Sequence, residues 1–184
     1  GSEMCIRDRS YFDIIITYSR CPRLTGYVAK DSMKKVPLLS VWMTRLHCLF
    51  INRSDVKEAL KTILAGIDNI KNGISMCIFP EGTRNKTEDL MLPFKEGSFK
   101  MAEKTGCLIV PMAISGSADI LEAHFPKVKP VHVIVEYGKP IDPKSLDKDT
   151  RKKLGSHCQG VIAEMLEKNN PQILDLEQRV ACDS

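Results

Sequence analysis

Residues 75–84 read Ser-Met-Cys-Ile-Phe-Pro-Glu-Gly-Thr-Arg, a short apolar run that ends in a polar turn. The run Ser75–Phe79 is typical of a buried strand in a sheet covered on both faces. Ligands of α/β sheets bind at the carboxyl ends of strands, which is where this turn lies. Gly82 allows the backbone to approach a ligand closely, Thr83 offers a hydroxyl, and Arg84 offers a fork suited to phosphate. The stretch indicates either a phosphate-binding loop or an ordinary polar turn.

The same alternation of short apolar runs and longer helical patterns continues on both sides of this stretch. Further strands are predicted at Leu24–Ala29, Cys48–Ile51, Cys107–Ser115 and Val131–Tyr137. Helices are predicted at residues 56–70, 97–104 and 147–168. Strands that alternate with helices indicate an α/β fold, and nearly continuous apolar strands indicate a sheet covered on both faces. We therefore expect a single-domain, mixed and largely parallel sheet with helices on both faces.

The two ends of the chain lack this pattern. Residues 3–9 show no apolar pattern continuous with the segment that begins at Ser10, and Gly1-Ser2 resembles a cloning remnant. The helical signal fades after Pro171. The sequence thus predicts a foreign segment at residues 1–9, one domain at residues 10–170 and a C-terminal tail at residues 171–184.

Composition excludes several classes of protein. The chain has 184 residues, of which 43% are hydrophobic and 27% charged, and these values are typical of one globular domain. The sequence has no run of the roughly 20 apolar residues that a membrane-spanning helix needs. Seven scattered cysteines without a C-x-x-C pair indicate reduced thiols in the cytosol. The four histidines do not stand at zinc-ligand spacings, so no metal is expected.

Positive charge is concentrated in the first third of the chain. Residues 1–60 carry ten Lys or Arg and six Asp or Glu, and this surplus of four equals the net charge of the whole chain. Such a surplus favours anionic partners, although a solvated basic face is the plainer interpretation. Nucleic acid is not the expected partner, because the basic residues carry no interleaved aromatic residues and no recognition motif.

Two of these basic residues follow predicted strands. Arg53 comes just after the strand predicted at Cys48–Ile51, and Lys30 comes directly after Leu24–Ala29. The carboxyl ends of parallel strands meet at one edge of a sheet, where ligands bind. We therefore expect Arg53 and Arg84 to converge on one phosphate with Lys30 in support, although any one of them alone is an ordinary surface charge.

One apolar segment lies beside basic residues. Val36–Met43 reads Val-Pro-Leu-Leu-Ser-Val-Trp-Met and is flanked by Lys34, Lys35 and Arg45. Such a segment suits a membrane interface, but it equally suits a helix packed into the core. The sequence leaves both interpretations open.

The turn and its neighbouring blocks resemble a known family, the glycerolipid acyltransferases, typified by the 1-acylglycerol-3-phosphate acyltransferases. The blocks that carry the resemblance are Phe79–Arg84 (FPEGTR), Val28–Lys30 (VAK), Phe50–Arg53 (FINR), Phe94–Phe99 (FKEGSF) and Val110–Met112 (VPM). Five blocks in the family's order make the resemblance specific, and it extends from about Ser10 to Tyr137. It implies the fold of that family and transfer of a fatty acyl group to a lysophospholipid.

The family's catalytic block pairs a histidine with an aspartate five positions later. Histidine is suited to take a proton from a hydroxyl near neutral pH, and the carboxylate orients the imidazole. Here Asp13 matches the aspartate, but Asp8 stands at the histidine position and Arg7 stands where asparagine is usual. Either a natural protein has lost its base and kept a phosphate site, or the first residues are not its own. The second explanation better fits a resemblance that begins abruptly at Ser10.

The resemblance implies the remaining roles. Arg53 and Arg84 would hold the acceptor phosphate with Lys30 in support, Gly82 and Thr83 would shape the pocket, and Glu81 would orient Arg84 or contact the acceptor.

The implied reaction converts 1-acylglycerol 3-phosphate to phosphatidate in phospholipid biosynthesis. It takes the acyl group from acyl-CoA or acyl carrier protein, needs no other cofactor and takes place at the cytoplasmic face of a membrane. We expect this chain to be nearly inactive, to bind that face peripherally and to derive from a protein anchored by sequence that precedes it. The alternatives are a non-catalytic lysophospholipid- or anion-binding module, and an acyltransferase for glycerol 3-phosphate or another lysophospholipid. The sequence does not indicate an oligomeric state.

Overall fold

The computed structural model describes residues 1–6, 10, 12–83, 89–121, 123 and 125–182. Its six strands form one sheet in the order β3-β2-β4-β1-β5-β6. The strands are β1 (Glu3–Ile6), β2 (Thr25–Lys30), β3 (Leu49–Ile51), β4 (Ser75–Ile78), β5 (Ile109–Ser115) and β6 (Ile134–Tyr137). All neighbours are parallel except β5 and β6, which are antiparallel. The predicted mixed, largely parallel sheet is confirmed.

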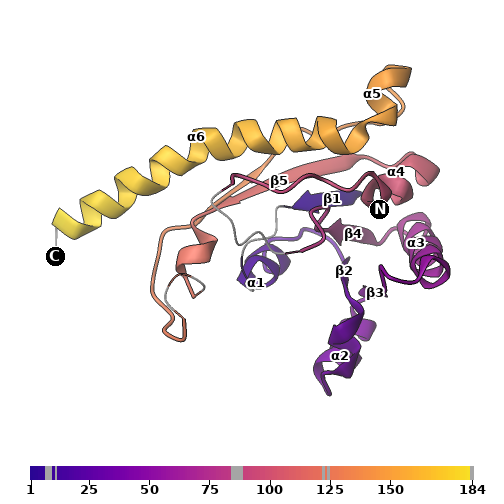
Figure 1. The fold of residues 1–184 in the computed structure, drawn as a ribbon, viewed down its shortest axis with the longest axis horizontal. Helices are drawn as coiled ribbons and strands as arrows, with labels where there is room; N and C mark the ends of the chain where they lie inside the picture. The colour runs from indigo at the N-terminus through magenta and orange to yellow at the C-terminus, as the bar shows by residue number, and fades with distance from the viewer. Residues whose placement is uncertain (7–9, 11, 84–88, 122, 124, 183–184) are drawn as a thin grey trace.

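Helices cover both faces of this sheet (Figure 1). The α-helices are α1 (Phe12–Tyr18), α2 (Leu39–Arg45), α3 (Val56–Lys71), α4 (Lys100–Thr105), α5 (Lys148–Lys152) and α6 (Leu154–Cys182). The described residues also form the short 3-10 helices η1 (Asp31–Lys35), η2 (Glu96–Phe99) and η3 (Ser117–Asp119). One face of the sheet packs against α3, α4 and α6, and the other face packs against α1 and α2.

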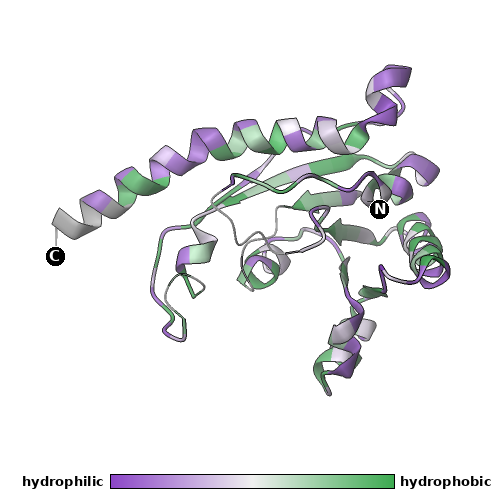
Figure 2. Ribbon diagram, viewed as in Figure 1, coloured by the Kyte–Doolittle hydropathy of each residue, from purple (hydrophilic) through white to green (hydrophobic). Residues whose placement is uncertain are grey.

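Alternation along the central strands explains the two layers. In β1, Met4 and Ile6 belong to the core cluster under α1 and α2, whereas Cys5 belongs to the cluster under α6. Side chains of a strand point to opposite faces in turn, so a strand buried on both faces must be apolar throughout. In Figure 2 the central strands are accordingly coloured mostly as hydrophobic, and α6 carries alternating hydrophilic and hydrophobic segments.

Helix α3 confirms its prediction and adds an unexpected feature. The Asp55 carboxylate caps the helix by accepting hydrogen bonds from the backbone N–H groups of Lys57 (2.9 Å) and Glu58 (3.1 Å). Ile67 and Ile70 pack against the sheet. The apolar residues of the first turns, by contrast, face outward, because Val56, Leu60 and Leu64 are exposed.

Glu3–Ile6, which lie in the segment expected to be foreign, form a strand that the sequence did not predict. These residues form β1, which pairs with β4 on one side and β5 on the other. Glu3 is buried, and its Oε2 accepts a hydrogen bond from Ala102 N at 3.0 Å. Burial raises the pKa of Glu3 to about 8. The strand was missed because Glu3 interrupts its apolar pattern, and sequence periodicity does not predict a buried glutamate. The foreign origin of residues 1–9 stays a prediction.

The predicted end of the last helix at Lys168 is also wrong. After the short α5, helix α6 begins at Leu154 and continues through Pro171 to Cys182. Tertiary contacts hold the helix on both sides of the proline: Lys168 Nζ and Asn169 Nδ2 donate to the Glu136 carboxylate of β6, at 2.7 and 2.8 Å. Ile173 is buried. These contacts offset the backbone hydrogen bond that proline removes.

Two smaller predictions need correction. The helix predicted at residues 97–104 starts as the 3-10 helix η2 and ends where Gly106 takes φ +64°. The strand predicted to start at Val131 starts at Ile134. Among the described residues, no helix combines the length and the apolarity that crossing a membrane requires.

Candidate functional site

The sheet topology brings the predicted site residues to one edge. Strands β1 to β5 are mutually parallel through their neighbours, so their carboxyl ends share an edge of the sheet. Lys30 ends β2 and is paired in register with Ile51 of β3, two residues before Arg53. Glu81, Gly82 and Thr83 follow β4, which is the other neighbour of β2. Arg84, which was predicted to lie at this edge, and Asp8, which stands at the family's base position, lie outside the described residues.

Arg53 and Gly82 lie in direct contact. A Cβ atom built on Gly82 would overlap the Arg53 side chain at Nη1 and would lie 2.6 Å from its Cζ. Gly82 also has φ +76°, a conformation that other residues rarely adopt. The glycine therefore serves two purposes, because it makes the turn and it leaves room for the guanidinium. Two segments that are 29 positions apart in the sequence meet here. The predicted convergence of Arg53 and Arg84 on one phosphate stays a prediction.

Glu81 connects the turn to the segment that follows it. This carboxylate is buried, and its Oε2 accepts a hydrogen bond from Leu92 N at 2.8 Å. Pro80 O accepts a second hydrogen bond from Lys95 N at 3.0 Å. Residues 92–95 thus lie beside the turn and are hydrogen-bonded to it. The roles predicted for Glu81 involve Arg84 or the acceptor, and they stay predictions. Its observed partner is the backbone of Leu92, which sequence motifs do not reveal.

The same segment is also fixed to the start of α6. The carboxylate of Glu96 accepts hydrogen bonds from Gly155 N (2.9 Å) and Ser156 N (3.2 Å). Phe94 N donates to Gln159 Oε1 at 3.1 Å. A carboxylate at a helix N-terminus satisfies free N–H groups and complements the helix dipole. The FKEGSF block therefore links α6 to the turn that contains Gly82 and the exposed Thr83.

Asp13 lies in the first turn of α1 and is almost fully buried, at 1% exposure. Its Oδ2 accepts a hydrogen bond from Ser10 N at 2.8 Å, and Ser10 Oγ accepts one from Phe12 N at 3.0 Å. This reciprocal pair is a capping box at the start of α1. The sequence predicted that Asp13 orients a histidine, and it missed the cap, although the spacing of Ser10 and Asp13 is the signal for one.

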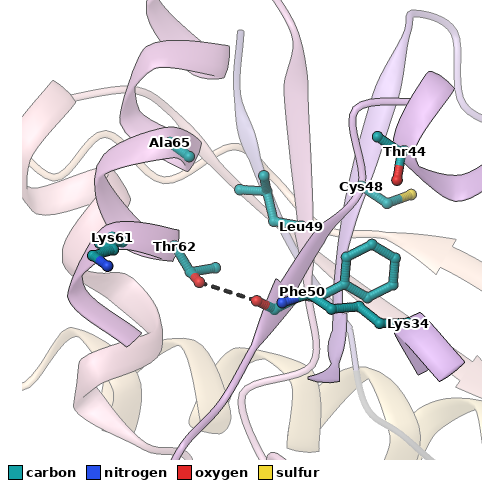
Figure 3. Close-up of a pocket in the computed structure, with 8 residues that line it drawn as sticks. All are labelled: Lys34, Thr44, Cys48, Leu49, Phe50, Lys61, Thr62 and Ala65. Carbon is teal, nitrogen blue, oxygen red and sulfur yellow. Dashed lines mark hydrogen bonds between the residues drawn. The ribbon is translucent and has the colours of Figure 1, made fainter. Parts of the chain in front are cut away.

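A shallow groove of about 260 Å³ lies over the outer strand β3 (Figure 3). Its lining residues are Lys34, Thr44, Cys48, Leu49, Phe50, Lys61, Thr62 and Ala65. Lys34 pairs with Asp31 and Lys61 pairs with Glu58, each at 2.7 Å. Because both ammonium groups have carboxylate partners, the groove suits an apolar group better than an anion. Among the described residues, no three His, Cys, Asp or Glu side chains gather as metal ligands.

Comparison with known proteins decides the family. A family model described as Acyltransferase matches residues 9–115, which is more than half of the chain and begins one residue after Asp8. The chain belongs to this acyltransferase family. The matched region contains the Arg53–Gly82 contact and the Asp13 cap.

Named relatives extend the comparison. The chain is 33% identical over 166 residues to a 1-acyl-sn-glycerol-3-phosphate acyltransferase of Saccharomyces cerevisiae, covering 89% of the chain and 54% of that protein. A protein of the same name from Haemophilus influenzae is 30% identical over 175 residues, covering 94% of the chain and 68% of the relative. The chain therefore spans about half to two thirds of the length of these relatives.

A solved structure supports the fold. The crystal structure of the 1-acyl-sn-glycerophosphate (LPA) acyltransferase PlsC from Thermotoga maritima matches with a TM-score of 0.77. The match covers 91% of the chain and 66% of that protein at 24% sequence identity. The predicted α/β fold is thus the fold of an acyltransferase.

Proposed function

We propose that the site belongs to an acyltransferase that moves a fatty acyl group to the 2-hydroxyl of 1-acylglycerol 3-phosphate, giving phosphatidate. The observation that carries this proposal is the Arg53 guanidinium lying against Gly82 at the carboxyl edge of the sheet. A guanidinium at a glycine turn offers charge, directed N–H donors and close backbone approach, which together suit a phosphate. The names of the relatives support this acceptor.

The proposed reaction needs a base but no covalent enzyme intermediate. The acceptor's hydroxyl oxygen attacks the thioester carbonyl of acyl-CoA or acyl-acyl carrier protein and forms the ester bond. The carbon–sulfur bond breaks, and the proton passes from the hydroxyl through the base to the departing thiolate, which leaves as a thiol. Arg53 and Arg84, with Lys30, would hold the phosphate, and Gly82 and Thr83 would shape the pocket. No metal or further cofactor takes part in this proposal.

Position 8 limits the activity of this chain. The resemblance puts the base at that position, and Asp8 occupies it between Arg7 and Arg9. A carboxylate between two arginines is a weaker base than an imidazole at neutral pH. We therefore propose that the chain binds the acceptor and turns it over slowly. Asp13 would orient the imidazole of a restored histidine through whichever of its oxygens faces position 8.

The test is to restore the base. The double variant Asp8→His with Arg7→Asn and the unchanged chain would be supplied with lysophosphatidate and acyl-CoA, and release of free thiol would be followed. General base catalysis is typically worth about 10²–10⁴-fold in rate, so a gain within that range is expected. A folded double variant that binds lysophosphatidate without any gain in turnover would favour the non-catalytic binding module. Competition with glycerol 3-phosphate and other lysophospholipids would identify the preferred acceptor.

The phosphate assignment has its own control. In the histidine-restored protein, Arg53→Ala and Arg84→Ala should raise the KM for lysophosphatidate, each by about tenfold or more, because a charge-assisted hydrogen bond is lost. Arg23→Ala removes the same charge from an exposed residue outside the blocks and serves as the matched control. Equal effects of Arg23→Ala and Arg53→Ala would contradict the assignment.

The membrane is the second part of the proposal, and helix α2 supports it. Leu38, Val41 and Trp42 are exposed, at 85%, 54% and 52%, and Lys34 and Lys35 lie just before them. Leu38 also has φ +62°, which is strained for a residue with a Cβ. Of the two interpretations of Val36–Met43, core packing holds for Met43 and Leu39, and the exposure of Leu38, Val41 and Trp42 supports the interfacial one. A peripheral position at the cytoplasmic face of a membrane would bring the site to its lipid substrate.

The membrane contact of α2 can be measured without a label. Trp42 is the only tryptophan of the chain, so its fluorescence reports on α2 alone. Vesicles with anionic lipid should shift its emission to the blue, and brominated acyl chains should quench it. Unchanged emission together with no co-sedimentation would remove this part of the proposal.

A further inference from the structure

The segment between β5 and β6 leaves the sheet at the same edge as the candidate site. Strand β5 ends at Ser115, three residues after Met112, which pairs in parallel with Ile6 at the end of β1. The segment returns at Ile134, where β6 begins antiparallel to β5. A hydrogen bond from Lys129 N to Ile120 O, 2.9 Å long, closes its outer part. Figure 1 shows this segment extending away from α6, on the side where α1 and α2 lie.

The outer part of this segment combines apolar and basic side chains. Phe125 and Val128 are 78% and 62% exposed, and Lys127 and Lys129 alternate with them and are exposed as well. Neither apolar residue belongs to a core cluster. We define residues 125–129 as the β5–β6 tip. An exposed phenylalanine beside lysines is typical of a surface that enters the headgroup region of an anionic bilayer.

The chain that follows the tip packs into the same core cluster as α1 and α2. Tyr18 of α1 contacts Trp42 of α2 with ring centroids 5.8 Å apart. Tyr18 also packs against the same core cluster as Val133, just after the tip. On α1, Ile15 is 64% exposed. Three segments from different parts of the sequence thus present exposed apolar residues around the edge that holds Asp13 and the phosphate-binding residues.

We infer that the β5–β6 tip is a second membrane contact, which inserts Phe125 and Val128 among anionic lipids while Lys127 and Lys129 contact their headgroups. This inference rests on the proposed function, since it names the surface that would deliver the lipid acceptor to the site. With α2 alone in contact, the domain would be free to tilt about that helix. A contact from β5–β6 as well fixes the carboxyl edge of the sheet toward the bilayer, where the lysophospholipid lies.

Lipid, rather than a protein partner, is the occupant that the charges favour. The tip carries two lysines and no acidic residue, and Lys34 and Lys35 of η1 and Arg45 of α2 are basic as well. A juxtamembrane lysine contributes about 1 kcal/mol of attraction to an anionic leaflet, which corresponds to about fivefold in partitioning. Each tip lysine should therefore increase partitioning onto vesicles with anionic lipid by about fivefold.

The experiment moves the single tryptophan. In the full chain, Trp42→Phe combined with Phe125→Trp places the only fluorophore at the tip. Vesicles of phosphatidylcholine and phosphatidylserine carrying brominated acyl chains should quench it. The control combines Trp42→Phe with Leu108→Trp, because Leu108 is exposed and directly precedes β5 at the opposite edge of the sheet. The control tryptophan should remain unquenched.

The charge of the tip is tested by co-sedimentation. Lys127→Gln with Lys129→Gln should weaken binding to vesicles with phosphatidylserine by about 25-fold and leave binding to pure phosphatidylcholine unchanged. Lys152→Gln with Lys153→Gln removes the same charge from exposed residues at α5 and should have little effect. Quenching at Trp42 but not at position 125 would overturn the inference and leave the proposed function intact. Equal quenching at positions 125 and 108 would overturn it too.

Discussion

The two ends of the candidate site are built in different ways. At one end, Arg53 and Gly82 follow separate strands and meet in a contact that only the parallel sheet creates. At the other end, Asp13 is buried and bound within its own helix turn by Ser10. The phosphate end thus depends on tertiary structure, and the aspartate end depends on local structure together with the residue at position 8. A chain that lacks the proposed base can therefore keep the residues of the proposed phosphate site.

The largest expected effect separates the two roles of Asp13. In the histidine-restored protein, Asp13→Asn should lower kcat by about 10²–10⁴-fold, because an amide neither stabilises an imidazolium nor fixes its useful tautomer. The asparagine oxygen still accepts from Ser10 N, so the melting temperature should change little.

Ser10→Ala is the matched control for that comparison. It removes the acceptor of Phe12 N, costs about 1 kcal/mol of stability and should leave kcat nearly unchanged. If both variants lowered stability and activity in parallel, Asp13 would be a cap alone.

The next effect concerns β1, the strand that precedes Asp13 in the chain. The pKa of Glu3 is raised from 4.5 to about 8 because the carboxyl is buried. The folded state thus holds a proton that the unfolded state has released, so stability is highest below about pH 4.5 and is lost as the pH rises through about 8. Glu3→Gln should keep the hydrogen bond from Ala102 N and stabilise the protein at pH 9 by on the order of 2–4 kcal/mol.

Chemical denaturation at a series of pH values between 4 and 9 measures this difference. The curves of the two proteins should converge at acid pH and separate at alkaline pH. Parallel curves throughout would show that Glu3 is ionised in the folded protein.

The smallest effect concerns the phosphate end. Gly82→Ala places a Cβ against the Arg53 guanidinium and strains a backbone with φ +76°. We expect the affinity for a short-chain lysophosphatidate to fall by about tenfold, with a stability loss of about 1 kcal/mol. Gly97→Ala is the control, because a Cβ at Gly97 meets no atom within 4 Å. Calorimetric titration of both variants measures the affinities. Unaltered binding by Gly82→Ala would show that the turn does not contact the acceptor.

Much of the architecture was predictable because the pattern is local. The Asp55 cap and the apolar spacing after it predicted α3, and the apolar run Ser75–Phe79 predicted β4. Parallel pairing then required the residues after these strands to share an edge. Sequence patterns failed where tertiary contacts outweigh local preference: Glu3 sits in a central strand, and the contacts of Asn169 and Ile173 carry α6 past Pro171.

By itself, the sequence determined the fold class, the family blocks, the presence of Asp8 where the family has its base, and the expectation that Arg53 and Arg84 converge on one phosphate. These properties follow from periodicity and from side-chain chemistry at fixed positions. Only the tertiary structure decided that Arg53 lies on Gly82, that Glu81 braces Leu92, and that Phe125 and Val128 are exposed on the side of α1 and α2. Such contacts join residues far apart in the chain, and no local sequence pattern predicts which of them become neighbours when the sheet forms.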